Sequence, residues 1–556
     1  MSDEIIADYI VVGAGSAGCV LANRLSALPE NEVLILEAGG DDRPLKNPKQ
    51  FISNVLIHTP IGFGITLHDR KVNWMYETEA DPGSANRKHL WPKGKVLGGS
   101  SSINGLLYVR GQHADYDGWR QMGCEGWSYD DVKPYFRRAQ HQERGESDWH
   151  GSGGPLNTSD MTEKHPISAD LIEACVEAGI PRSDDINAHD QEGATWFQFT
   201  IKNGRRHSAA VAYLHPAMKR PNLRVETEAL TTRILFEGKR AIGIEYLQGG
   251  KRKVARARRE VILAAGSVAS PQILELSGIG QPEILAEHGI PLVHALPGVG
   301  ENLQDHYMIG MQWRLKKEYI TVNQRAHGLK LAKEILRYGF SRKGLLSFAV
   351  AHIVAFAKSR PDLAHPDIQL HLMPASVDLK RLAETQAFTL ETEPGMTITP
   401  CQLRPESRGH IHIKSKDPTV YPSIFANYLG DPIDRQAAID GVKLARRVAQ
   451  APAMAKYVAY EDFPGKDVQT DEEIATYTTF AGTTLYHPVG TCKMGHDPMA
   501  VVDPQLRVHG IEGLRVVDAS IMPRIVSGNT NAPTIMIGEK GADLILEDAR
   551  RLRAAA

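Results

Sequence analysis

The first forty residues alternate apolar and glycine-rich stretches in an order that predicts a strand, a tight turn, a helix and a second strand. An apolar run leads into Gly13, Gly15 and Gly18, and a second apolar run over 33–36 ends at Glu37. Gly13 permits a sharp turn, Gly15 lets backbone N–H groups approach a pyrophosphate, and Gly18 lets the helix pack close to the strand. Glu37 can accept hydrogen bonds from ribose hydroxyls. The pattern favours a bound dinucleotide over a plain glycine turn, and it leaves NAD and FAD as alternatives.

Later apolar runs continue this α/β pattern. A buried strand is predicted over 260–263, followed by a small-residue turn and a helix that starts near Ser270. Another strand over 514–517 ends in an acid, Asp518, and an apolar helix follows Asn531 near the end of the chain. These segments predict that the nucleotide-binding unit is completed by distant parts of the sequence.

The pattern changes in the middle of the chain. Between about 311 and 470, polar and apolar residues alternate, as over 410–413, where two isoleucines share one strand face and two histidines the other. Helix-like spacing covers 328–338 and 439–450. This region predicts a separate α+β domain, whereas 39–75, interrupted by proline and glycine, predicts a long loop.

Composition and charge limit the classes of protein to which this chain can belong. Of 556 residues, 42% are hydrophobic and the net charge is -2, which gives no general attraction to nucleic acid or anionic lipid. The basic run over 251–259 is interpreted as the solvated face of a hairpin strand. Five scattered cysteines without a C-x-x-C motif fit a reducing cytosol, and no metal site is expected. No signal peptide and no run near the ~20 apolar residues of a membrane span is found, so a cytoplasmic protein is expected.

Four separated motifs together resemble the glucose–methanol–choline (GMC) oxidoreductase family of FAD enzymes. They are the N-terminal glycine motif with Glu37, the glycine-rich stretch 94–104, the segment 266–280, and a tail that contains 487–491 and 529–533. The sequences of these motifs are most similar to those of the branch of bacterial choline and alcohol dehydrogenases. The resemblance implies FAD rather than NAD, bound to a Rossmann-type domain built from non-contiguous segments.

The resemblance also implies a division of the chain. We expect an α/β fold, α+β overall, with an FAD-binding domain formed by 1–158, 218–310 and 475–556. The substrate-binding domain is expected over 159–217 and 311–474, with helices and an antiparallel sheet that roofs the flavin. Some choline-oxidising relatives tether FAD through a histidine in the glycine-rich loop. Ile103 stands at that position, so non-covalent FAD is expected.

The family's cofactor contacts carry over to a defined set of residues. The expected FAD-binding residues are Gly13, Gly15, Ser16, Ala17, Gly18, Glu37, Ala38, Trp74, Val96, Gly98, Gly99, Ser102, Asn104, Gly105, Ala229, Ala265, Gly266, Ser270, Tyr486, Asp518, Ala519, Asn531, Pro533 and Thr534.

The expected reaction is oxidation of a primary alcohol to an aldehyde. Flavin N5 takes the hydride, and His487, at the family's catalytic position, takes the hydroxyl proton. Asn531 is expected to orient the substrate oxygen, with a simple helix N-cap as its alternative role. Electrons then pass to a quinone-like acceptor or to O₂, with a dehydrogenase favoured over an oxidase. Choline, aliphatic alcohols and aromatic alcohols stay open as substrates. The oligomeric state also stays open, with a homo-oligomer as one alternative.

Several alternatives use the same fold. A hydroxynitrile lyase or a fatty-acid photodecarboxylase would be non-redox, and Cys401 and Arg404 lie where decarboxylating relatives keep a cysteine. Those relatives lack the catalytic histidine that this chain has. A flavin-binding protein without catalysis is a further alternative. His410 and His412 could chelate a metal from one strand face, but a solvated strand is the favoured interpretation.

Overall fold

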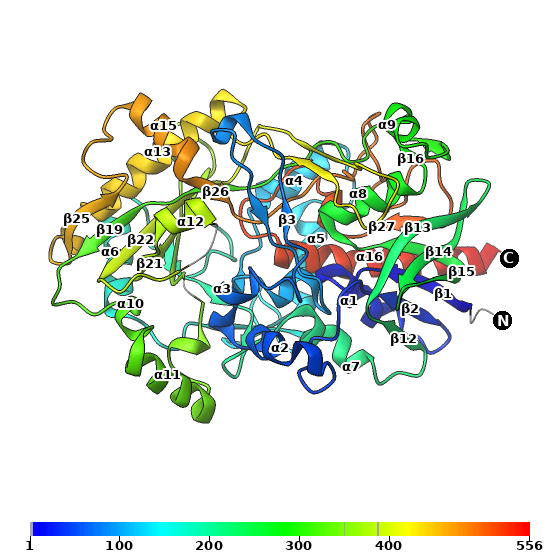
Figure 1. The fold of residues 1–556 in the computed structure, drawn as a ribbon, viewed down its shortest axis with the longest axis horizontal. Helices are drawn as coiled ribbons and strands as arrows, with labels where there is room; N and C mark the ends of the chain where they lie inside the picture. Colours follow the sequence, from blue (N-terminus) through cyan, green and yellow to red (C-terminus); the bar gives the residue numbers. More distant parts are fainter. Residues whose placement is uncertain (1–3, 350, 386–388, 556) are drawn as a thin grey trace.

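The first of two large sheets carries the dinucleotide motif. The computed structural model of the chain describes residues 4–349, 351–385 and 389–555 (Figure 1). In the seven-stranded sheet, the parallel strands run in the order β12 (Leu223–Glu226), β2 (Val33–Leu36), β1 (Ile5–Val12), β15 (Lys251–Leu263) and β27 (Leu514–Val516). This reversal of strand order around β1 is that of a Rossmann fold, which opens a crevice at the carboxyl ends of β1 and β15.

Strand β15 belongs to two structures at once. Its first half pairs antiparallel with β14 (Arg240–Gln248), which in turn pairs with β13 (Ala229–Glu237). Its second half lies between β1 and β27, where Val261, Ile262 and Leu263 are fully buried. Three exposed basic residues, Lys251, Arg252 and Lys253, fall in the hairpin half, and Arg258 is exposed farther along the strand.

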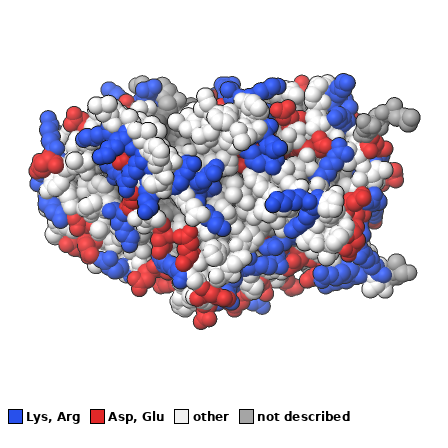
Figure 2. All heavy atoms as spheres, turned by 90° about the horizontal axis from the view of Figure 1, so that it is seen from below, with Lys and Arg blue, Asp and Glu red and all other residues white. Residues whose placement is uncertain are grey.

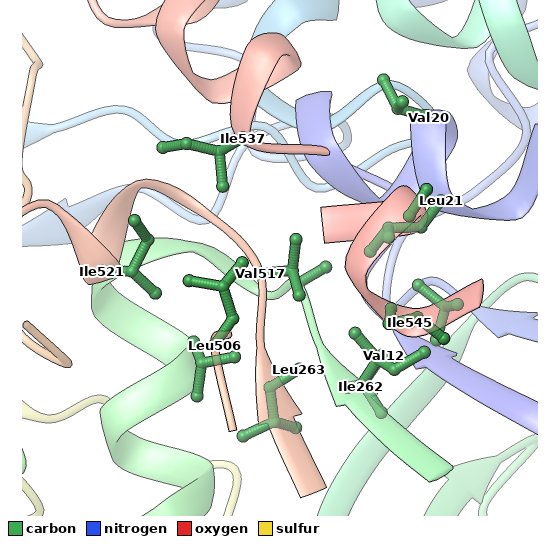
Figure 3. Packing of buried hydrophobic residues seen from close by; sticks show 14 of the residues in the cluster. Val12, Val20, Leu21, Ile262, Leu263, Leu506, Val517, Ile521, Ile537 and Ile545 are labelled. Carbon is green, nitrogen blue, oxygen red and sulfur yellow. The ribbon is translucent and has the colours of Figure 1, made fainter. Parts of the chain in front are cut away.

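The core of this unit lies between the sheet and two helices. Helix α1 (Ser16–Leu25) packs against α16 (Asn531–Ala555), although the two lie at opposite ends of the chain. Figure 3 shows Val12 of the sheet beside Ile545 of α16, and Leu263 and Leu21 belong to the same buried cluster. Strands buried in this way form from nearly continuous apolar runs, which is why the sequence pattern identified them.

The second sheet is antiparallel and has eight strands. They are β8 (Gly193–Trp196), β18 (Tyr307–Ile309), β19 (Gln312–Leu315), β20 (Ile353–Ala357), β21 (Ile368–Met373), β22 (Gly395–Gln402), β25 (Val458–Phe463) and β26 (Gly482–Thr484). Helices α6 (Pro166–Glu177) and α13 (Pro432–Ala449) pack on one side of it, and α15 (Asp471–Ala481) packs on α13. This body forms the left part of Figure 1.

The remaining elements surround these two sheets. The helices are α2 (Phe51–His58), α3 (Phe63–Thr66), α4 (His113–Gln121), α5 (Tyr129–Ala139), α7 (His215–Ala217), α8 (Gly266–Leu276), α9 (Pro282–Glu287), α10 (Val322–Arg325), α11 (Gly328–Ser341), α12 (Leu379–Thr385) and α14 (Pro452–Ala455). The short strands are β3 (Tyr76–Glu77), β4 (Leu90–Trp91), β5 (Leu107–Tyr108), β6 (Gln140–Gln142), β7 (Leu156–Asp160), β9 (Gln198–Phe199), β10 (Ile201–Lys202), β11 (Arg205–Arg206), β16 (Ile279–Gly280), β17 (His294–Ala295), β23 (His410–His412) and β24 (Ser423–Phe425).

Some elements differ from the sequence predictions. The expected loop over 39–75 contains α2 and α3, and Ile57 of α2 is buried in a small cluster with Val72, Val96 and Ile103. Helix α13 begins at Pro432 rather than 439, because the Asp431 carboxylate accepts the N–H of Ile433 and caps an earlier start. Strands β18 and β26, expected in the FAD-binding segments, pair within the antiparallel sheet. Conversely, 209–217, expected in the substrate-binding domain, packs into the core around α1.

Candidate active site

A cavity runs between the two sheets, from the carboxyl ends of β1 and β2 to the inner face of the antiparallel sheet. It brings together residues from both ends of the chain. The predicted site residues that line it are Gly13, Gly15, Ser16, Ala17, Glu37, Ala38, Trp74, Gly99, Asn104, Gly105, Ala229, Ala265, Gly266, Tyr486, His487, Asp518, Ala519, Asn531 and Thr534. Ile103, expected at the position of a tethering histidine, also lines it.

The glycine motif forms one wall by close backbone contacts. Gly13 has a φ of +98°, and a Cβ on Gly18 would lie 1.9 Å from the Gly13 carbonyl oxygen. A Cβ on Gly99 would lie 2.7 Å from the Gly15 Cα, so the two glycine-rich segments touch here. No side chain caps α1 at Gly15. The first N–H groups of the helix therefore stay open toward the cavity, which suits a phosphate group.

Glu37 lies where β2 ends, with its carboxylate held by the turn. Its two oxygens accept hydrogen bonds from the N–H groups of Ala14 and Gly39, each at 2.9 Å. Burial raises the pKa of Glu37 to about 7, against these hydrogen bonds. The side chain is thus fixed at the cavity wall at the end of the strand, the position at which a ribose hydroxyl is bound in Rossmann folds.

Part of the predicted cofactor set supports the wall without lining it. Ser270 donates to the Asp518 carboxylate at 2.6 Å, and the Gly266 N–H donates to the same oxygen at 2.8 Å. The Ser102 hydroxyl donates to the Leu97 carbonyl at 2.7 Å and so faces its own turn. Six residues of the expected set do not line the cavity: Gly18, Val96, Gly98, Ser102, Ser270 and Pro533.

Two buried hydroxyl groups at the cavity wall bear on whether FAD fits the site. Within the part of the chain that the structure describes, the Thr231 and Ser267 hydroxyl oxygens have no hydrogen-bond partner. An unpaired buried hydroxyl costs free energy, so such groups indicate a polar ligand. Together with the glycine cradle and the anchored Glu37, they fit a long polar dinucleotide such as FAD.

His487 lies at the far end of the cavity, buried beneath the antiparallel sheet. Its backbone N–H donates to the Asp305 carboxylate at 2.7 Å, and the same carboxylate accepts the hydroxyls of Tyr428 and Thr484 at 2.5 Å each. Burial, with Lys93 and His306 nearby, holds the pKa of His487 well below its ordinary value. The ring is therefore neutral at neutral pH and free to accept a proton.

A chain of hydrogen bonds decides which nitrogen of His487 carries its proton. His306 Nε2 lies 3.1 Å from the Leu403 carbonyl oxygen, which only accepts, so Nε2 of His306 must carry the proton. Burial lowers the pKa of His306 to about 4, so its Nδ1 is a bare acceptor. This Nδ1 lies 3.0 Å from His487 Nδ1, which must then donate. His487 Nε2 is left unprotonated, as a hydrogen-bond acceptor at the cavity.

Asn529 is the polar partner of that acceptor nitrogen. Its amide nitrogen lies 3.2 Å from His487 Nε2, and its amide oxygen accepts from Gln369 at 3.4 Å. Asn531, to which the sequence analysis gave the role beside the base, instead accepts a hydrogen bond from the Ser16 hydroxyl at 2.8 Å. This contact joins the first turns of α16 and α1, at the end of the cavity with the glycine motif.

Several residues around the base were missed by the sequence analysis. Asp305, His306, Lys93 and His371 lie outside every recognised motif, and no local spacing marks them. Lys93 donates to the Tyr486 carbonyl at 2.6 Å, and burial lowers its pKa to about 8. Asn529 could have been identified from the sequence, because it lies in the same tail motif as Asn531.

The histidine pair on β23 has other partners. His412 lies 2.7 Å from a Glu275 carboxylate oxygen and 3.1 Å from Glu301. Although burial opposes it, these hydrogen bonds raise the pKa of His412 to about 9. Its charged ring thereby ties β23 to α8. Over the described residues, no group of three or more potential metal ligands comes together.

Among the helices of the described residues, none is both long and apolar enough to traverse a bilayer.

Comparison with known proteins fits this geometry. The GMC oxidoreductase N-terminal domain matches residues 7–308, and its C-terminal domain matches 405–538. An oxygen-dependent choline dehydrogenase of Escherichia coli is 44% identical over 543 residues, covering 97% of this chain and 95% of that protein. An alcohol dehydrogenase (acceptor) of Pseudomonas putida is 43% identical over 545 residues, covering 97% of this chain and 95% of that protein. The crystal structure of pyridoxine 4-oxidase from Mesorbium loti superposes with a TM-score of 0.85 and 28% identity, covering 97% of this chain and 98% of that one. The chain therefore belongs to the GMC oxidoreductase family.

Proposed function

We propose that this protein oxidises a primary alcohol to an aldehyde with non-covalent FAD as cofactor and His487 as base. Family membership makes it a flavoprotein that acts on alcohols in general. The finer proposal rests on the unprotonated Nε2 of His487, which faces the Asn529 amide in the cavity. We propose that a dehydrogenase, passing electrons to a quinone-like acceptor, is favoured over an oxidase.

The two side chains can hold one hydroxyl group between them. The substrate oxygen would accept a hydrogen bond from the Asn529 amide and donate its own proton to His487 Nε2. Removal of that proton as the hydride leaves is general base catalysis, typically worth ~10²–10⁴-fold in rate. Bound FAD supplies the hydride acceptor. The low pKa of His487 keeps the base unprotonated when the substrate arrives.

A first experiment tests the base. His487→Ala should retain FAD but slow anaerobic flavin reduction by alcohol by about a hundredfold or more, the range expected for a lost base. His410→Ala, a histidine that does not line the cavity, is the matched control. Asn529→Ala should slow reduction more than Asn531→Ala does. Near-normal reduction by His487→Ala would disprove the assignment of the base.

The same experiment separates the non-redox alternatives. A hydroxynitrile lyase or a photodecarboxylase would leave its flavin oxidised when it is mixed with alcohols without O₂. The thiol of Cys401 is fully buried, outside the cavity lining, and burial raises its pKa well above the ordinary value. That environment keeps the thiol protonated and favours the redox reaction over a role for Cys401.

We further propose that the substrate is an uncharged, apolar alcohol rather than choline. The inner face of the antiparallel sheet presents no charge to the cavity: alternate residues of β21 and β22 supply His371, Met373, Thr397 and Thr399. Aliphatic side chains complete this end, namely Leu67, Ala349, Ala351, Val377, Leu379 and Leu382.

Charge at the cavity wall also disfavours a cationic substrate. Within the described lining, the carboxylates are Glu37 and Asp518, and both belong to the dinucleotide half, engaged with backbone and hydroxyl donors. Lys93, near the base, carries a positive charge of its own. A quaternary ammonium buried at this end would lack a carboxylate partner.

A matched pair of substrates tests this point. Choline and 3,3-dimethylbutan-1-ol have nearly the same shape and differ in charge. The neutral alcohol should show a kcat/KM higher by about tenfold or more, because the cation would be buried without a partner. Equal or better turnover of choline would overturn the substrate assignment while leaving the role of His487 intact.

A further inference from the structure

Helix α11 carries an apolar face that nothing in the described structure covers. Leu329 and Phe340 are 91% and 92% exposed, and Leu336 is also exposed. Spacings of seven and four residues put these three side chains on one side of the helix. Burying such side chains is normally favourable, so an uncovered row of this kind marks an interaction site.

A second apolar cluster lies on the same side of the molecule. Phe51, Ile52 and Val55 of α2 are exposed, with Ile52 at 75%. In Figure 1, α2 and α11 both project from the lower edge. They are linked through packing of 60–62 against 345–347, the segment that follows α11. We call these six side chains of α2 and α11 the docking face.

Basic residues accompany the docking face. The segment 328–343 contains five basic residues and one acidic residue, Glu334, whose carboxylate is engaged by Arg325 at 2.6 Å. Lys330 and Lys333 lie along the flank of the apolar row of α11, and Arg337 on the same flank is paired with Glu163 at 2.6 Å. Figure 2 views the molecule from this side and shows Lys and Arg side chains interspersed with Asp, Glu and uncharged surface.

We propose that the docking face binds the surface of an anionic phospholipid bilayer. An amphipathic helix with Leu and Phe on one side and Lys and Arg beside them lies in the membrane interface, with its apolar side in the acyl boundary. A second copy of this chain fits less well. A symmetric contact would bring the basic flanks of two α11 helices against each other.

The docking face is continuous with the wall of the active-site cavity. Phe63 of α3 and Ala349 line the cavity, and both belong to the apolar cluster that contains Leu345 and Phe348. An apolar alcohol dissolved in the bilayer would thus reach the cavity beside the bound surface. This consequence rests on the proposed function, whereas lipid binding itself rests on the exposed side chains and their charges alone.

Vesicle sedimentation of the FAD-loaded protein tests the proposal. Wild type should bind phosphatidylcholine vesicles that contain phosphatidylglycerol, and binding should weaken with added salt. Leu329→Ser/Phe340→Ser should lower the partition coefficient by about tenfold or more, since two buried apolar side chains are lost. Lys330→Glu/Lys333→Glu should lower it on anionic vesicles and leave pure phosphatidylcholine unaffected.

The controls separate this result from misfolding and from self-association. Ile433→Ser removes an exposed apolar side chain on α13 and should bind like wild type. All variants should oxidise alcohol with a water-soluble acceptor at the wild-type rate. The proposal fails if wild type does not bind anionic vesicles, or if the α11 variants bind them as well as wild type does. It also fails if sedimentation velocity shows a wild-type dimer that the Leu329→Ser/Phe340→Ser variant abolishes.

Discussion

His306 sets the proton on the base without touching the substrate position itself. Its Nε2 donates to the Leu403 carbonyl, and its Nδ1 accepts from His487. The neutral ring therefore has a fixed hydrogen-bond polarity, with its donor toward the backbone and its acceptor toward His487. Burial lowers the pKa of His306 to about 4, which keeps that polarity constant at neutral pH. We therefore propose His306 as a positioning residue for the reaction in which His487 would be the base.

Replacement of His306 by leucine should make His487 a poorer base. The proton of His487 would then be free to occupy Nε2, which would no longer accept the substrate hydroxyl proton. We expect flavin reduction to slow by about tenfold, below the full range for general base catalysis because the base itself remains, with FAD retained. His306→Asn, which can accept at the same place, should recover part of the rate. A purely structural role would slow both variants alike and would lower FAD content.

Residue roles could be predicted only where a motif fixes the backbone. His487 and the glycines were identified because their neighbours in sequence carry the pattern. Asn529 and Asn531 are two residues apart, and the turn at Gly528, with a φ of +151°, decides which of them faces the base. Asp305 and His306 act through contacts that lie 182 and 181 positions away in sequence, which no local pattern encodes.

At the scale of elements, the glycine turn depends on the approach of α1 to β1. The position of Gly18 leaves no room for a side chain, because a Cβ would lie 1.9 Å from the Gly13 carbonyl oxygen. That atom is backbone and belongs to the turn that shapes the cavity wall. A change that disturbs the packing of α1 on β1 should therefore also disturb the phosphate-binding geometry.

Gly18→Ala should push α1 from the sheet and weaken FAD binding. We expect loss of most bound FAD and a destabilisation of about 1–3 kcal/mol, as for an overpacked core. Gly118→Ala, in α4, is the control, since a Cβ there meets nothing within 4 Å. Flavin absorbance per protein and the midpoint of urea unfolding measure both effects. Full FAD content in the Gly18→Ala variant would contradict the packing argument.

Prediction of elements succeeded where periodicity is local and failed where pairing is distant. The first βαβ unit and helix α11 follow from short stretches of sequence. Strands β18 and β26 have three residues each and gain their hydrogen bonds from partners far along the chain. Strands this short have too little alternation to assign to one sheet or the other.

For the molecule as a whole, His412 links parts that lie far apart in sequence. Its charged ring bridges Glu275 of α8 and Glu301, which places the hairpin of β23 and β24 against the nucleotide-binding unit. The pKa of His412 is raised in the folded protein, so the bridge stabilises the protonated, folded state.

Stability from this bridge should fade in alkali. The contribution is fully present below the ordinary histidine pKa of about 6.5 and is lost as the pH rises through about 9. We expect His412→Gln to be less stable than wild type by up to ~3 kcal/mol near pH 6, and by little near pH 10. Urea unfolding across this range measures the difference. A gap that stays constant with pH would show that the ring is not charged in the fold.

The hydrogen bond from Ser16 to Asn531 spans 515 positions of the chain, and Arg24 reaches Glu539 over the same interval. During synthesis the glycine turn leaves the ribosome long before α16, which closes the cavity beside it. A nascent chain thus exposes a nucleotide cradle without its second wall. Stable uptake of the dinucleotide should therefore follow the synthesis of α16, and a stop codon anywhere before α16 should yield a protein without flavin.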